Sequence, residues 1–196
     1  MTIDVDFENH ILETLNSGKS VEEFLDHAVK FIAEVTTRLI SKIFRKDDYA
    51  IRYAIDPLFG GNGPLSELGV KLKLLYALGI INRQEYEDTD HLLALYDEVM
   101  DKTSDLICTN HSNQSYQFTD EEVIAICHQL NCVEVKPVLF QNVHGKNDDI
   151  HDHNLLQMQQ KRNRQVIKST LVLSVSALIS QLYKKPAEKI SPLPQI

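Results

Sequence analysis

Glycine and proline are scarce in this 196-residue chain, which contains seven glycines and six prolines. Sandwiches and barrels need many tight turns, and tight turns depend on these two residue types. Apolar residues make up 43% of the chain, with leucine and isoleucine dominant, and the length suits one domain with a substantial core. The composition therefore predicts an all-α fold, a single-domain bundle of about seven or eight helices over residues 1–185. A disordered tail is expected at 186–196, which holds three prolines.

Cysteine is also scarce, and Cys108, Cys127 and Cys132 form no disulfide framework. Three free thiols are typical of a cytoplasmic protein. Cys127, His128 and Cys132 lack the close cysteine pairing of zinc sites, so we expect no metal. The N-terminus has no basic and apolar signal sequence. The most apolar run, 166–182, contains serines and is shorter than the roughly 20 residues of a membrane span, so we expect no membrane contact.

Basic residues are in deficit, with 20 lysines and arginines against 28 acidic residues and a net charge of −8. Proteins that bind DNA on their own usually carry a basic surface. The deficit is uneven, because residues 154–196 hold seven basic residues and one acidic residue, a balance of +6 that leaves −14 for residues 1–153. Any contact with nucleic acid should therefore use the last helix, expected from about Asn154 to Lys184. Its exposed cations would be Lys161, Arg162, Arg164 and Lys168.

Capping patterns mark the starts of two helices. Ser20 and Glu23 have the spacing of a capping box, in front of an apolar stripe that runs from Val21 to Ile43. Thr119 and Glu122 repeat this spacing before a second, shorter helix.

The stretch from 44 to 90 packs three helical patterns together with short joints. A helix over 47–56 is expected to stop at Pro57, which cannot donate to a helix. The Gly60–Gly63 loop should lead into a helix that begins with Pro64 at its first position. Gly79 should end that helix in a left-handed conformation.

Five short runs in this stretch carry a resemblance to a known family. They are Arg45-Lys46-Asp47-Asp48-Tyr49-Ala50, Asp56-Pro57-Leu58, Gly61-Asn62-Gly63-Pro64-Leu65, Leu72-Lys73-Leu74-Leu75-Tyr76-Ala77-Leu78-Gly79 and Ile81-Asn82-Arg83-Gln84-Glu85-Tyr86-Glu87-Asp88. Together these runs resemble the mannitol operon repressor family of bacterial transcriptional regulators. The resemblance extends more loosely over most of the chain. It implies an all-helical fold and a role in repressing genes for mannitol use, and it implies no catalytic site.

A helix-turn-helix is one interpretation of the two helices that meet at Gly79. The second helix argues against it, because a recognition helix places its first turns between DNA phosphates. Its first turns carry one arginine and four carboxylates, namely Arg83, Glu85, Glu87, Asp88 and Asp90. We therefore expect a helical hairpin that packs into the core. Residues Asp101 to Gln117 are polar and are expected to form a loop.

Tyr49 and Tyr53 lie one helical turn apart, with Arg52 beside them. Asp48, Arg52 and Asp56 have the spacing of an ion-pair ladder, which would make this face ordinary solvated surface. The alternative is that Tyr49, Arg52 and Tyr53 belong to a binding surface. The sequence leaves both interpretations open.

Three functions are weighed against each other. The first is a repressor of the mannitol utilisation operon that acts through an unidentified protein partner, with weak or indirect DNA contact. The alternative is a repressor that binds DNA directly with Lys161, Arg162, Arg164 and Lys168, although phosphate contacts alone read little sequence. The third is an enzyme, which is disfavoured because the chain shows no paired nucleophile and base, no metal spacing and no nucleotide motif. We expect no cofactor, and the apolar helix faces would allow a homodimer.

Overall fold

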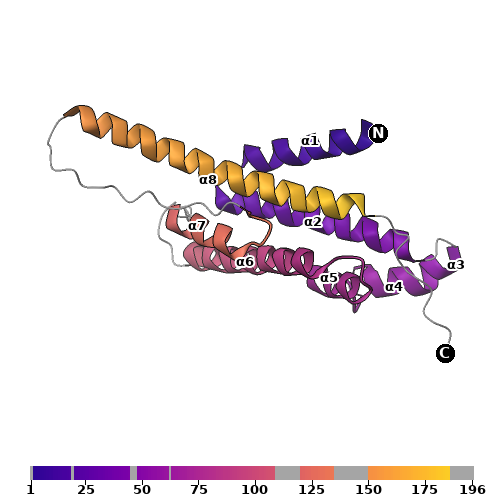
Figure 1. Cartoon of the computed structure of the whole chain (residues 1–196). Helices are drawn as coiled ribbons and strands as arrows, with labels where there is room; N and C mark the ends of the chain where they lie inside the picture. Colours follow the sequence, from indigo (N-terminus) through magenta and orange to yellow (C-terminus); the bar gives the residue numbers. More distant parts are fainter. Residues whose placement is uncertain are drawn as a thin grey trace.

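The computed structural model describes residues 2–18, 20–44, 48–61, 63–108, 120–134 and 150–185. In chain order the elements are α1 (Thr2–Ser17), α2 (Val21–Ile43), α3 (Asp48–Ala50), a π-helical turn η1 (Ile51–Ile55), α4 (Asp56–Phe59), α5 (Leu68–Ala77), α6 (Arg83–Cys108), α7 (Asp120–Gln129) and α8 (Ile150–Lys184). The described part of the chain contains no strand, and the predicted all-α bundle is confirmed (Figure 1). The expected tail at 186–196 and the expected cap at Thr119 lie outside the described residues.

Helix α2 is the centre of the bundle and packs against α1, α5, α6 and α8. It begins as the sequence predicted, because the Ser20 hydroxyl accepts a hydrogen bond from the Glu23 N–H at 3.2 Å. Its predicted apolar stripe is buried along most of its length, at Phe24, Leu25, Ala28, Ile32, Val35 and Leu39. One face of α2 therefore supplies much of the core that the other helices cover.

Helices α1 and α8 lie together along one side of α2 (Figure 1). The Phe7 ring of α1 stacks on the Tyr183 ring of α8, with 4.0 Å between their centroids. The Arg38 guanidinium of α2 lies 3.5 Å from the centre of the same Tyr183 ring. A cation over an aromatic face adds an electrostatic attraction to the apolar contact, so this ring joins all three helices.

Helix α8 is longer than expected, since it begins at Ile150 instead of near Asn154. The segment Gln165–Lys184 is apolar and long enough to cross a membrane, yet half of it is buried within the protein. A core helix has the same composition, and the buried side chains point into the bundle at Ile167, Leu171, Val172, Val175, Leu178, Ile179 and Leu182.

The corner between α5 and α6 is closed by Gly79, as predicted. Its φ is +70°, a left-handed conformation that favours glycine. The Gly79 N–H donates to the Tyr76 carbonyl at 2.9 Å and the Ile80 N–H donates to the Leu75 carbonyl at 3.0 Å. This pair of bonds is a Schellman motif, which satisfies the last carbonyls of α5.

Helix α6 begins with a capping box that the sequence analysis missed. The Glu85 N–H donates to Asn82 Oδ1 at 2.9 Å, and Glu85 Oε2 accepts from the Asn82 N–H at 2.7 Å. Asparagine replaces the usual serine or threonine at the cap. The far end was also predicted wrongly, because α6 continues from Asp101 to Cys108 where a loop was expected. An ion pair between Lys102 and Glu98, at 2.6 Å, helps to carry the helix through this polar segment.

Two carboxylates near the start of α6 are buried. Glu85 is 6% exposed, and its Oε2 lies 2.6 Å from Nζ of Lys185, just beyond the end of α8. Asp88 is fully buried and accepts hydrogen bonds from the backbone N–H groups of Asn131 at 2.5 Å and Cys132 at 2.8 Å. The sequence analysis assumed that all four carboxylates at the start of α6 would repel DNA from an exposed surface, and this assumption is wrong for Glu85 and Asp88. They instead join the first turns of α6 to α8 and to the turn after α7, so these turns are not free to enter a groove.

Candidate docking surface

The segment of residues 48–59, called here the docking arm, is one continuous helical rod at the end of the bundle where α2 finishes (Figure 1). Its middle is the π-helical turn η1, whose last bond runs from the Asp56 N–H to the Ile51 carbonyl. The backbone stays helical on both sides, with φ and ψ of −63° and −39° at Ala50 and −59° and −43° at Asp56. Short π-helical turns within α-helices are rare and frequently lie at functional sites.

Pro57 does not end the helix, contrary to the prediction. It lies within the first two residues of α4, directly after the π-helical turn. An N–H at the start of a helical segment needs no partner within that segment, so the missing N–H of proline is tolerated there. The change from π to α geometry thus lets the rod continue to Phe59.

The arm exposes its two tyrosines to solvent. Tyr49 is 74% exposed and Tyr53 is 70% exposed, and their ring centroids lie 4.6 Å apart. Leu58 adds a further apolar side chain at 40% exposure. Across residues 48–59, all of which the structure describes, no residue is buried. The arm therefore presents aromatic area to solvent, while its last residue, Phe59, packs half-buried against the core.

Arg52 lies on the same arm and is exposed. The expected ion-pair ladder is not formed, because the described contacts include no bond between Arg52 and either Asp48 or Asp56. The π-helical turn changes the helical repeat that would align these three side chains. The expected ion pairs are therefore absent among the described residues, and Arg52 is an exposed cation on the arm that carries the two tyrosines.

The arm is held at its far end by the glycine loop. The Leu65 N–H donates to the Leu58 carbonyl at 2.9 Å, and the Phe59 ring lies 5.1 Å from the Phe44 ring, centre to centre. A Cβ on Gly63 would overlap the Leu58 carbonyl oxygen, so this position requires glycine. Residues 63–67 belong to this loop, so α5 begins at Leu68 and not at Pro64 as predicted.

The basic part of the predicted surface lies elsewhere. Lys161, Arg162, Arg164 and Lys168 are all on α8, and the start of α8 lies at the opposite end of the bundle from the arm (Figure 1). Lys161 and Arg162 are exposed, and the side chain of Arg164 lies outside the described part of the structure. Lys168 Nζ donates to the backbone carbonyls of Asn16 at 3.0 Å and Gly18 at 2.8 Å.

The predicted residues therefore do not form one surface. The structure brings the rings of Tyr49 and Tyr53 together, leaves Arg52 exposed on the same arm, and gives Lys168 a structural role at the end of α1. Leu58 was missed as a member of the exposed set. Leu58 directly follows Pro57 in the short segment before the glycine loop, and this position could have indicated that its side chain is exposed.

Comparison with known proteins gives the chain a family. A family model described as "Mannitol repressor" matches residues 7–183. The chain is 44% identical over 181 residues to the mannitol operon repressor of Escherichia coli, covering 92% of this chain and 85% of that protein. It is 22% identical over 176 residues to a protein named Fumarase E from the same organism, covering 89% of this chain and 96% of that one.

A solved structure agrees with these matches. It is the X-ray structure of the MtlR–HPr complex from Escherichia coli, 43% identical, with a TM-score of 0.72 and coverage of 91% of this chain and 99% of that chain. The family resemblance of the five sequence runs is thereby confirmed, and this chain belongs to the mannitol repressor family.

Proposed function

We propose that this protein represses a mannitol utilisation operon by binding a protein partner through the docking arm. The observation that carries the proposal is the pair of solvent-exposed tyrosines, with their rings in contact, on an arm that has no fully buried residue. Tyrosine and arginine are enriched in protein interfaces and among the residues that contribute most binding energy. Tyr49, Tyr53 and Arg52 would supply such a group on one short helix.

HPr is the partner that we propose. The relative solved in complex with HPr is 43% identical to this chain and aligned over nearly all of its length. A partner-dependent repressor needs no DNA-reading helix of its own, which agrees with the net charge of −8. The proposal places the protein in the cytoplasm, where it would act without a catalytic reaction.

Direct DNA recognition receives less support. The first turns of α6 are tied to Lys185 and to Asn131, so they are not free to enter a major groove. Lys168 is engaged at the end of α1, which leaves Lys161 and Arg162 as the described, exposed cations from the predicted set. Two phosphate contacts would give weak and strongly salt-dependent binding.

The partner proposal is tested by titration calorimetry of the purified chain with HPr from the same organism. Tyr49→Ala and Tyr53→Ala should each weaken binding about tenfold, because truncating a central interface tyrosine costs more than 1 kcal/mol. Val166→Ala is the control, since Val166 is 57% exposed but lies on α8. Wild-type affinity in both tyrosine variants would refute the arm as the docking surface, and no binding by the wild type would refute HPr as the partner.

A mobility-shift assay with operator DNA separates this function from the alternative. We expect no shift by the chain alone at physiological salt. A sequence-dependent shift that is lost when Lys161 and Arg162 are replaced by alanine would instead support direct binding.

A further inference from the structure

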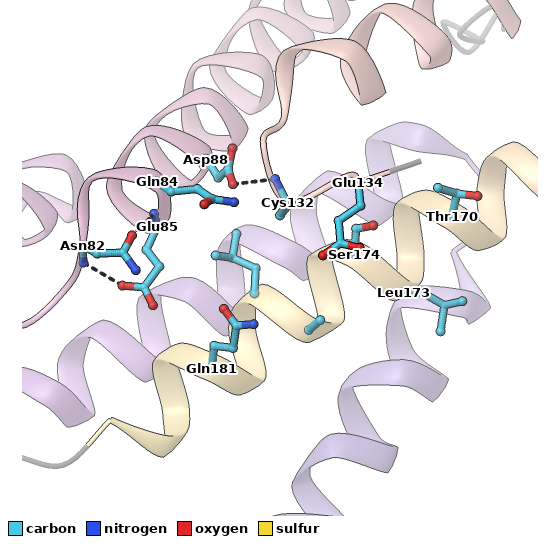
Figure 2. Close-up of a pocket in the computed structure, with 12 residues that line it drawn as sticks. Asn82, Gln84, Glu85, Asp88, Cys132, Glu134, Thr170, Leu173, Ser174 and Gln181 are labelled. Carbon is cyan, nitrogen blue, oxygen red and sulfur yellow. Dashed lines mark hydrogen bonds between the residues drawn. The ribbon is translucent and has the colours of Figure 1, made fainter. Parts of the chain in front are cut away.

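A cavity of about 590 Å³ lies between the start of α6, the segment that follows α7, and the second half of α8 (Figure 2). This volume is within the range of about 300–1,000 Å³ that is usual for small-molecule sites. None of the docking-arm residues lines it. The cavity is therefore a separate feature, and an inference about it does not depend on the docking proposal.

Four polar side chains from the three elements converge on this space. Gln84 comes from α6, Glu134 from the segment after α7, and Ser174 and Gln181 from α8, and Figure 2 shows them around one opening. Within the described part of the chain, none of these four side chains has a hydrogen-bond partner. Gln84, Glu134 and Gln181 are exposed, whereas Ser174 is half-buried, and its hydroxyl is partly shielded from solvent. Polar groups in a partly buried position are stabilised by a hydrogen-bonding partner, which a ligand could provide.

The remaining wall is apolar. Leu178 is buried and lines the cavity, and Leu173 and Ala177 line it from the same helix. The lining thus offers hydrogen-bonding groups on several sides and a hydrocarbon surface on another. A carbon chain with hydroxyl groups matches both parts of this lining.

The charge of the lining limits the ligand further. Among the residues that the structure describes, no lysine, arginine or histidine lines the cavity, whereas Glu85, Asp88 and Glu134 do. Glu85 is paired with Lys185, and Asp88 is bonded to two backbone N–H groups, which leaves the Glu134 carboxylate free. A carboxylate accepts hydrogen bonds and repels anions, so a phosphate ester or an organic acid would be disfavoured.

We infer that this cavity is a binding site for a small, uncharged polyol, in which Gln84, Glu134, Ser174 and Gln181 bond the hydroxyl groups and Leu178 contacts the carbon chain. The site joins three segments that are distant in sequence. A bound polyol would bridge α6, the segment after α7, and α8, and would therefore stabilise the folded protein by mass action.

The experiment uses the full chain, with titration calorimetry and thermal unfolding in D-mannitol or D-sorbitol as the hexitol probes. We expect saturable binding of at least one hexitol and a saturable rise in Tm, and no binding of D-mannitol 1-phosphate at the same concentrations. A linear, unsaturable rise in Tm would be the general effect of an excluded osmolyte and would refute the site. Binding of the phosphate ester as tightly as a hexitol would refute the uncharged class.

Two pairs of variants locate the binding. Ser174→Leu fills the cavity, whereas Ser169→Leu places the same side chain at an exposed position of the same helix that does not line it. Gln181→Leu removes a polar group that is exposed and therefore dispensable for folding, with Gln165→Leu as its exposed match on α8. Hexitol affinity should fall about tenfold or more in the first member of each pair and stay unchanged in the second. Unchanged affinity in Gln181→Leu together with a folded, binding-competent Ser174→Leu would overturn the inference.

Discussion

Asp88 of α6 accepts a hydrogen bond from the backbone N–H of Asn131, a residue 43 positions further along the chain. Its other carboxylate oxygen accepts from the Cys132 N–H at 2.8 Å. The side chain is fully buried, so one carboxylate joins the start of α6 to the turn after α7 without contact with water. The position of Cys132 and Glu134, which line the cavity, depends on this joint.

Replacing Asp88 should therefore destabilise the fold. Asp88→Ala leaves two partly buried N–H groups without partners, and each unsatisfied group costs about 1–3 kcal/mol. Urea unfolding should show a loss of about 2–6 kcal/mol on this basis. Asp90→Ala is the matched control, because Asp90 is exposed on the same helix and should change stability by less than about 0.5 kcal/mol. Equal losses in the two variants would contradict the structural role of Asp88.

The same carboxyl group predicts a pH dependence. Burial raises the pKa of Asp88 above its ordinary value of 3.8, and the bonds from Asn131 and Cys132 and the nearby His91 only partly oppose this. Because the folded pKa exceeds the unfolded pKa, the folded protein binds the proton more tightly. Its contribution to stability is fully present below pH 3.8 and is lost as the pH rises through the folded pKa.

This dependence is measured as the difference in unfolding free energy between the wild type and Asp88→Asn. The stability advantage of the wild type should shrink as the pH rises from below 3.8 toward neutrality. Taking the difference cancels the titration of the other carboxyl groups, including Glu85 and Glu134 across the cavity. An advantage that instead grows with pH would show that the bonds to the charged form outweigh desolvation.

The sequence predicted the elements that depend on local chemistry. Ser20 and Gly79 act through their own backbone neighbours, so their effects on α2 and α5 were predictable from the sequence. The π-helical turn was not, because nothing in the residues before Pro57 marks a change of helical repeat. The burial of Asp88 and the cavity depend on residues more than 40 positions apart, and no local pattern encodes such contacts.

Glu85 and Lys185 should show energetic coupling. Their side chains are 8% and 21% exposed, so the pair is largely shielded from water and from salt. A double-mutant cycle with Glu85→Gln and Lys185→Met should give a coupling energy of about 1–3 kcal/mol by urea unfolding. The double variant should therefore lose less unfolding free energy than the sum of the losses in the two single variants. Strict additivity would mean that the ion pair contributes nothing.

Gly63 and Gly69 should respond in opposite ways to replacement by alanine. In Gly63→Ala the new methyl would overlap the Leu58 and Pro57 carbonyls, so the loop and the end of the arm must shift. We expect a lower Tm and weaker partner binding. Gly69 lies in α5, where an added methyl would have nothing within 4 Å, so Gly69→Ala should raise stability by about 0.5–1 kcal/mol. Unchanged binding and Tm in Gly63→Ala would show that the loop does not position the arm.

Lys168 should stabilise α1 and should not act as a DNA contact. Its ammonium group donates to the Asn16 and Gly18 carbonyls at the C-terminal end of α1, where a positive charge also interacts favourably with the helix dipole. Lys168→Met should cost roughly 1 kcal/mol and speed hydrogen exchange in the last turn of α1. Lys161→Met removes the same charge from an exposed position on the same helix and should leave both measurements unchanged. Faster exchange confined to α1 in the first variant distinguishes capping from a general loss of positive charge, which both variants share.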